Sequence, residues 1–263
     1  MKDLKKIKNF LLDMDGTIYL GDRLFDVTPK LLDRIAKKGG RAVFLTNNSS
    51  KSGESYLQKL KGMGLEVSLD DFFTSGDATA ITLKQRYASP RVYLIGTPSL
   101  ERQFLDYGIE LVKDENDIPD CVVLGFDLTL TYEKIRIGCK MIAKGAKFIA
   151  THPDRLCPAP GISIPDVGSM IKMFTEATGV VPEIMGKPEQ TMASAVFERY
   201  GFAPDETAMV GDRLSTDIRF ANNSGITAIA VLTGETTSEE IAASVDARPD
   251  FVFASVGELA DEI

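Results

Sequence analysis

The stretch NFLLDMDGT, residues 9–17, decides the fold of this chain. Its apolar run, residues 10–12, is typical of a short buried strand, and Asp13 and Asp15 follow at once. Residues two apart in an extended segment point to the same side, so both carboxylates are expected to face one cleft. Gly16 then allows a sharp turn of the backbone. The strand is therefore followed by two carboxylates on one side, and a shared chemical function would explain this arrangement.

Short apolar runs recur along the chain and alternate with helical patterns. Runs of this kind suit strands that are covered on both faces. Thr28 and Pro29 are expected to open one helix as N-cap and first-turn proline, and Pro188 to open another that reaches about Tyr200. The alternation predicts a doubly wound, Rossmann-like parallel α/β sheet with right-handed crossovers. The expected strands are NFLLD (9–13), RAVFLT (41–46), RVYLIG (91–96), CVVLGF (121–126), KFIAT (147–151), TAMVGD (207–212), TAIAVL (227–232) and DFVFA (250–254).

Polar side chains follow several of these runs where the strand is predicted to end. Ligands of parallel sheets bind outside the carboxyl ends of the strands, so these side chains are expected to gather at one edge. Carboxylates, a lysine, and hydroxyl or amide groups suited to an oxyanion all occur there. The residues are Asp13, Asp15, Thr46, Asn47, Asn48, Lys187, Asp212 and Asp217.

The charge of this cluster restricts what it can hold. Unit charges ~4 Å apart interact by about 4 kcal/mol at an effective dielectric of about 20, so four carboxylates around Lys187 would repel each other and any anion. A divalent cation is therefore required, and all-oxygen ligands favour Mg²⁺. With Mg²⁺ and Lys187 in place, a phosphate becomes an acceptable ligand.

Composition excludes several other classes of function. The net charge of -8 argues against a nucleic-acid partner, which needs a cationic face. No apolar stretch approaches the ~20 residues of a membrane span, and residues 10–12 are too short for a signal peptide, so a cytoplasmic protein without a membrane partner is expected. The 3 cysteines are widely spaced without a C-x-x-C pair, and His152 is the single histidine, which argues against zinc sites and a Ser-His-Asp triad.

The order D-x-D-G-T, Thr-Asn-Asn, Lys, G-D-x-x-x-T-D resembles the haloacid dehalogenase superfamily of aspartate-nucleophile phosphotransferases. The chain resembles more closely its class IIA, NagD-like branch of sugar phosphatases and p-nitrophenyl phosphatases. The matching stretches are LLDMDGTIYLGD (11–22), FLTNNSS (44–50), KFIATHPD (147–154), MGKPE (185–189) and VGDRLSTDI (210–218).

The resemblance implies a role for each motif. Asp13 would attack phosphorus and form an aspartyl-phosphate, and Asp15 would alternate as general acid and base. The substrate would be a small phosphorylated metabolite such as a sugar phosphate, with p-nitrophenyl phosphate as an artificial ester. Mg²⁺ would be held by Asp13, the main-chain carbonyl of Asp15, Asp212 and Asp217. The expected phosphate or substrate contacts are Thr46, Asn47, Asn48, Lys187, Arg213 and Thr216.

The resemblance also implies an inserted α/β cap domain of the C2 type. The catalytic core would be residues 1–77 and 181–263, with the cap at 78–180 between them. Hinges are expected at SGDATA (75–80) and ATGVVPE (177–183), which are rich in small residues and proline.

A long irregular loop is expected at residues 150–170, whose proline and glycine content is typical of a binding loop. His152 and Arg155 in this loop are predicted substrate contacts. A lone histidine is also often a structural hydrogen-bonding group, so both interpretations of His152 stay open.

Other functions share parts of this pattern. A phosphorylatable receiver module also uses aspartates, Thr or Ser, a lysine and Mg²⁺ on a parallel sheet, but needs no cap and about half this length. A phosphomutase or a phosphonatase of the same superfamily leaves no decisive trace, although a phosphonatase would need a cap lysine for a Schiff base. The physiological ester and any homo-oligomer stay open.

Overall fold

The computed structural model describes residues 2–158 and 161–263, which form two compact units. Unit 1 consists of Met1–Thr46, Gly53–Phe73 and Lys187–Ile263, and unit 2 of Asn47–Ser52 and Thr74–Gly186. None of the helices in the described part of the chain has the length and apolar character that crossing a bilayer demands.

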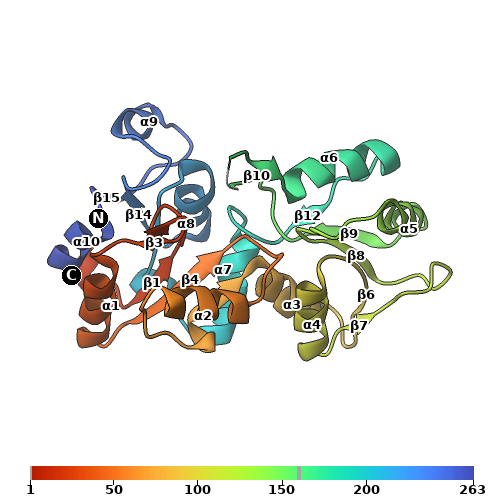
Figure 1. The fold of residues 1–263 in the computed structure, drawn as a ribbon, viewed down its shortest axis with the longest axis horizontal. Coiled ribbons are helices and arrows are strands. Elements are labelled where there is room, and N and C mark those ends of the chain that lie inside the picture. The colour runs from red at the N-terminus through yellow and green to blue at the C-terminus, as the bar shows by residue number, and fades with distance from the viewer. Residues whose placement is uncertain (1, 159–160) are drawn as a thin grey trace. The chain divides into compact units, whose positions relative to one another are not determined.

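Unit 1 is built on a six-stranded sheet with the order β15-β14-β13-β1-β4-β5 (Figure 1). Successive pairs from β15 to β4 are parallel, as the alternation of strands and helices predicts. The strands are β1 (Asn9–Leu12), β4 (Arg41–Thr46), β5 (Phe72–Thr74), β13 (Thr207–Gly211), β14 (Thr227–Val231) and β15 (Phe251–Phe253), with a small hairpin of β2 (Tyr19–Leu20) and β3 (Arg23–Leu24). The helices are α1 (Thr28–Lys37), α2 (Gly53–Gly62), α7 (Gln190–Tyr200), α8 (Arg219–Ser224), α9 (Ser238–Ala243) and α10 (Val256–Glu262).

Both faces of this sheet are buried. Phe10 and Leu12 of β1 pack in one apolar cluster with side chains of α1, α2 and α10, while Leu11 between them is also fully buried. Helix α8 contacts β13 and β14. Burial on both faces explains why these strands read as continuous apolar runs instead of alternating ones.

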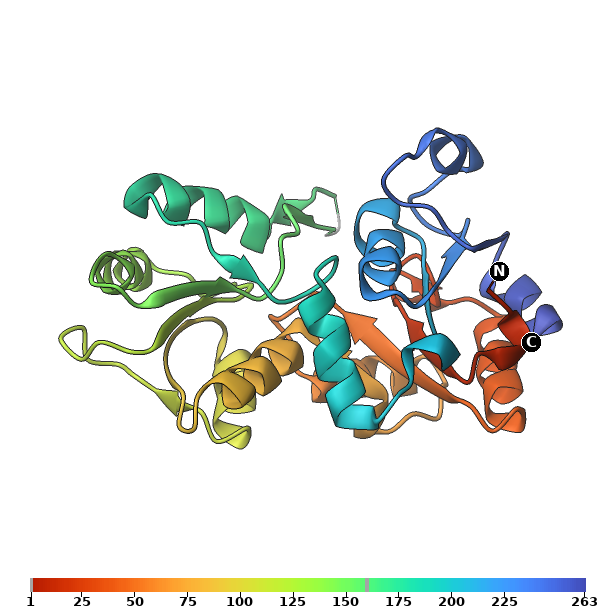
Figure 2. The same ribbon diagram turned by 180° about the vertical axis from the view of Figure 1, so that it is seen from behind.

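Unit 2 contains a second sheet, seen from behind in Figure 2. Its strand order is β12-β9-β8-β6-β7, and all its pairs are parallel. Helices α5 and α6 cover one face of this sheet, and helices α3 and α4 cover the other. Each face has its own apolar cluster. The strands are β6 (Arg91–Ile95), β7 (Glu110–Leu111), β8 (Cys121–Leu124), β9 (Lys147–Ala150) and β12 (Glu183–Ile184). The helices are α3 (Ser75–Arg86), α4 (Pro98–Asp106), α5 (Tyr132–Ala143) and α6 (Val167–Thr178).

Two predicted helix starts are wrong by one or two residues. Val27, not Thr28, is the N-cap of α1, and the Thr28 hydroxyl donates to the carbonyl of Ile18 at 2.7 Å. Helix α7 begins at Gln190 after the N-cap Glu189, so Pro188 precedes the helix instead of opening it. At α1, the bond to Ile18 occupies the hydroxyl that an N-cap would need.

The boundaries of unit 2 differ from those predicted for the insertion, 78–180. Residues 75–80, expected as a hinge, are the first turns of α3, where Thr74 and Asp77 form a capping box. Within 150–170, β10 (Leu156–Cys157) pairs with β11 (Ile164–Pro165), so part of the expected loop is a hairpin. Residues 159–160 of that segment lie outside the described residues.

Candidate active site

Three aspartates meet at the carboxyl edge of the unit 1 sheet. Asp13 follows β1 and Asp212 follows β13, and these strands are neighbours with Leu12 beside Val210. Asp217 lies in the π-helical turn that comes after β13. One carboxylate oxygen from each aspartate lies within 4.8 Å of the others. The fold thus gathers carboxylates that stand some 200 residues apart in sequence, as the strand-end argument predicts.

Lys187 is the cation of this cluster. Its Nζ donates to Asp13 Oδ1 at 2.6 Å, to Asp217 Oδ1 at 2.7 Å and to the carbonyl of Leu45 at 3.4 Å. The side chain is only 2% exposed. Burial by itself lowers the pKa of Lys187, but attraction by the two carboxylates outweighs it, so the pKa is raised. Lys187 therefore stays protonated and spans two aspartates.

One lysine does not neutralise three aspartates. Burial raises the pKa of Asp13 to about 7, aided by repulsion from Asp217 and Asp212 and opposed by Lys187. Burial and Asp217 likewise raise the pKa of Asp212 to about 6. These carboxylates carry more negative charge than the protein around them compensates. An all-oxygen cluster with excess negative charge fits a hard divalent cation such as Mg²⁺.

Asp212 is held in place by groups that the sequence interpretation missed. The Thr17 hydroxyl donates to its Oδ1 at 3.3 Å, and the backbone N–H of Glu235 donates to its Oδ2 at 2.8 Å. A Cβ on Gly16 or Gly234 would collide with the Asp212 carboxylate, so both positions need glycine. The segment LTGET after the apolar run 227–231 is itself a polar strand end, which is the pattern that could have revealed Glu235.

Asp15 differs from Asp13 in its surroundings. Met14 between them is buried in the apolar cluster of unit 1, whereas Asp15 is exposed and Asp13 is half-buried. Asp15 Oδ1 accepts a long hydrogen bond of 3.4 Å from the N–H of Gly21. A solvated carboxylate beside a half-buried one suits a proton carrier beside a nucleophile.

The other predicted residues of unit 1 lie around the same edge. Thr46 is the last residue of β4, the neighbour of β1 on the side away from β13. Arg213 pairs with Glu235 at 2.7 Å, and Thr216 lies half-buried in the same turn as Asp217. The phosphate contacts of Thr46, Arg213 and Thr216 stay predictions.

His152 is placed differently from its prediction as a substrate contact. Its side chain is fully buried in unit 2, with Nδ1 3.5 Å from Asp154 Oδ2 and Nε2 3.5 Å from Asp166 Oδ1. This environment supports the structural alternative, in which the imidazole links two carboxylates. Arg155 is exposed, and its role stays a prediction. The Asn47 amide lies in unit 2 as well, where it donates to Asp154.

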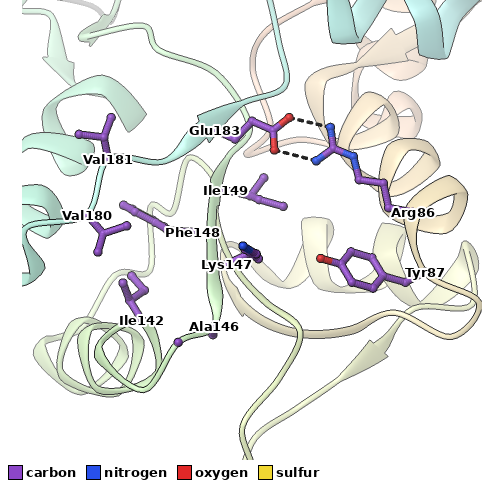
Figure 3. A pocket seen from close by; sticks show the side chains of 11 residues that line it. Arg86, Tyr87, Ile142, Ala146, Lys147, Phe148, Ile149, Val180, Val181 and Glu183 are labelled. Atoms are coloured by element: carbon purple, nitrogen blue, oxygen red, sulfur yellow. Dashed lines mark hydrogen bonds and ion pairs between the residues drawn. The ribbon is translucent and has the colours of Figure 1, made fainter.

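A separate pocket of about 500 Å³ lies in unit 2 around the start of β9 (Figure 3). Its polar wall includes Arg86 and Glu183, which form two ion-pair contacts of 2.7 and 2.6 Å. Phe148, Val180 and Val181 contribute apolar surface. None of the predicted site residues lines this pocket, so it is distinct from the carboxylate cluster.

Comparison with known proteins agrees with this architecture. Residues 10–110 match a family model for haloacid dehalogenase-like hydrolases, and residues 184–259 match a second, HAD-hydrolase-like model. The chain is 35% identical over 238 residues to an acid sugar phosphatase of Staphylococcus epidermidis, covering 90% of this chain and 91% of that protein.

Solved structures give the same result. A 4-nitrophenylphosphatase from Thermotoga maritima has a TM-score of 0.92 and 44% identity, covering 98% of both chains. A glycerol phosphate phosphatase from Mycobacterium tuberculosis, solved in complex with magnesium, has a TM-score of 0.89 and 29% identity, covering 98% of this chain and 78% of that one. A nagD protein has a TM-score of 0.91 and 40% identity, with full coverage of both chains. The chain therefore belongs to the haloacid dehalogenase-like hydrolases, and within them to the class IIA, NagD-like phosphatases.

Proposed function

We propose that this protein is a Mg²⁺-dependent phosphatase of small phosphorylated metabolites, such as sugar phosphates, that acts through an aspartyl-phosphate on Asp13. The observation that carries the proposal is the buried Lys187 ammonium between Asp13 and Asp217, beside Asp212, at the edge of the sheet. The relatives named as sugar, 4-nitrophenyl and glycerol phosphate phosphatases support the same substrate class.

Four groups of the chain carry the proposed reaction. An Asp13 carboxylate oxygen attacks phosphorus, and the bond from phosphorus to the leaving oxygen breaks as Asp15 donates a proton to that oxygen. Asp15 then takes a proton from the water that attacks the aspartyl-phosphate and regenerates Asp13. Lys187 and the Thr46 hydroxyl bind phosphoryl oxygens as negative charge shifts onto them.

The cation site in this proposal consists of Asp13, Asp212 and Asp217, with the main-chain carbonyl of Asp15. A bound Mg²⁺ supplies positive charge that offsets the carboxylates and the phosphoryl oxygens. Thr17 and the N–H of Glu235 orient the Asp212 carboxylate toward this task, as hydrogen-bond partners of metal ligands generally do.

Replacing Asp15 should produce a loss that depends on the leaving group. Asp15→Asn removes the proton donor, so kcat/KM for an alkyl phosphate, which reports the steps up to release of the alcohol, should fall by about 10²- to 10⁴-fold. The loss should be much smaller for p-nitrophenyl phosphate, because p-nitrophenolate leaves with little protonation. Steady-state kinetics on both esters measures the difference. Equal losses on the two esters would remove Asp15 from the role of general acid.

A panel of phosphate esters separates catalysis from substrate choice and tests the proposed function. Lys187→Ala should lower kcat/KM for every ester, because all share the phosphoryl group. Arg155→Ala should lower it unevenly, because only some leaving groups can contact a guanidinium. The exposed Lys172→Ala is the control for loss of a lysine. A wild-type protein that hydrolyses no ester of the panel with Mg²⁺ present would refute the proposed function.

A further inference from the structure

The segment Asn47–Ser52 follows β4 of unit 1 directly in sequence, yet it belongs to unit 2. It is held there by side chains: Asn47, Ser49 and Ser50 are all nearly or fully buried. Thr46 is predicted to bind the phosphoryl group, and the next residue, Asn47, already belongs to unit 2.

The position that this segment occupies in unit 2 is the one where doubly wound sheets bind ligands. The chain runs from β6 to β7 on one side and returns to β8 on the other, so the direction switches between β6 and β8. Ligands of such sheets bind at the carboxyl ends of the two strands that flank the switch. Thr97, after β6, donates to the carbonyl of Ser50 at 2.9 Å, and the N–H of Phe126, after β8, donates to Ser49 Oγ at 2.9 Å.

A third strand end adds to this anchoring. Thr151, after β9, shares a hydrogen bond of 2.9 Å with the Ser49 hydroxyl. At Gly125, a Cβ would collide with Leu100 Cδ2 and would also lie 3.3 Å from Ser49 Oγ, so the segment packs closely against this glycine. Three strand ends therefore fix Ser49 and Ser50, and the segment takes the place of a ligand.

Asn47 is held at the start of the same segment. Its Nδ2 donates to Asp154 Oδ2 at 3.1 Å and Oδ1 at 3.3 Å, and its carbonyl accepts from Ser75 Oγ at 2.5 Å. A Cβ on Gly186 would lie 2.6 Å from Asn47 Oδ1, which confines the amide from that side. Asp154 Oδ2 also lies 3.5 Å from Nδ1 of the buried His152. The orientation of the Asn47 amide is thus set by a carboxylate of unit 2.

We propose that Asp154 is a positioning residue for phosphoryl binding: it holds the Asn47 amide and thereby fixes the start of the segment Asn47–Ser52, which follows Thr46. The proposal rests on the phosphatase function proposed above. Arg155, the predicted contact to the leaving group, is the residue directly after Asp154.

A double-mutant cycle of Asn47→Ala and Asp154→Ala tests this assignment. In the wild-type background, Asp154→Ala should lower kcat/KM for p-nitrophenyl phosphate by about tenfold, largely through KM, and should weaken competitive inhibition by inorganic phosphate to a similar extent. In the Asn47→Ala background, Asp154→Ala should have no further effect on either quantity. Asp154→Asn keeps the size and one acceptor oxygen, so it should restore part of the loss.

Two controls keep the result decisive. Ser169→Ala removes a 2.6 Å hydrogen bond to the carbonyl of Arg155 in the same loop without touching Asn47, and kcat/KM should stay within about twofold. Thermal melts show which variants fold. If Asp154→Ala does not fold, the same cycle with Asp154→Asn in its place tests the positioning role. Equal losses in both backgrounds, or no loss from Asp154→Ala, would overturn the positioning role while leaving the phosphatase function intact. A wild-type protein without phosphatase activity would instead show that the proposed function fails.

Discussion

Asp13→Asn is expected to abolish turnover, with kcat for p-nitrophenyl phosphate falling by about 10⁴-fold or more, as for enzymes that lose their covalent nucleophile. The amide that replaces the carboxylate is a poor nucleophile toward phosphorus. The substitution also removes one of the three carboxylates of the cluster, which is the charged group that Lys187 contacts at 2.6 Å. Initial rates at saturating substrate and Mg²⁺ measure this loss.

The matched control is Asp26→Asn, which changes the same group at an exposed position of unit 1. Its kcat should equal that of the wild type. Folding of Asp13→Asn is not expected to suffer, because the neutral amide relieves repulsion from Asp212 and Asp217. A stable Asp13→Asn variant that retains more than about a tenth of the wild-type kcat would exclude covalent catalysis by Asp13.

Removal of the divalent cation has the second largest expected effect. Excess EDTA should lower the rate of p-nitrophenyl phosphate hydrolysis by more than about 100-fold, because a phosphate would then approach three aspartates balanced by a single buried lysine. Added Mg²⁺ should restore the rate in full. EDTA that has been saturated with Mg²⁺ beforehand controls for any other effect of the chelator.

Metal binding can also be followed without catalysis. A ligand that binds only the folded state at 100 times its Kd stabilises that state by about 2.7 kcal/mol, so Mg²⁺ should raise the Tm. Asp212→Asn should melt at a higher temperature than the metal-free wild type, because burial and Asp217 disfavour the charged carboxylate, and should gain little from Mg²⁺. An equal Mg²⁺-induced shift in both proteins, or full turnover in EDTA, would place the cation elsewhere.

The sequence predicted those parts of the site that depend on where strands end. In a parallel sheet, residues that follow neighbouring strands must share an edge, so Asp13 and Asp212 come together whatever lies between them. Lys187 does not follow from this rule, because the strand before it, β12, belongs to the sheet of unit 2. It was expected from the need for a cation near carboxylates. The eight predicted strands are all present because strands buried on both faces leave continuous apolar runs.

The rest depended on contacts between segments that no local pattern records. The sequence predicts Thr28 as an N-cap, but its hydroxyl donates a hydrogen bond to the carbonyl of Ile18 instead. His152 looks like an accessible group in a loop, yet two aspartates and the packing of unit 2 bury it. Asn47 continues a motif that begins in unit 1, whereas its side chain is held in unit 2 by Asp154, which lies 107 residues further along the chain.

The central claim, that Asp13 becomes phosphorylated, can be tested by trapping the intermediate. Borohydride reduces an acyl phosphate to an alcohol, so an aspartyl-phosphate becomes homoserine, which peptide mass spectrometry locates. Wild-type protein mixed with p-nitrophenyl phosphate and Mg²⁺ and then treated with borohydride should contain homoserine at position 13. The same treatment without the ester, or with Asp13→Asn, should give none. Homoserine at Asp15 or at another aspartate, or none while the ester is being hydrolysed at the full rate, would contradict the account.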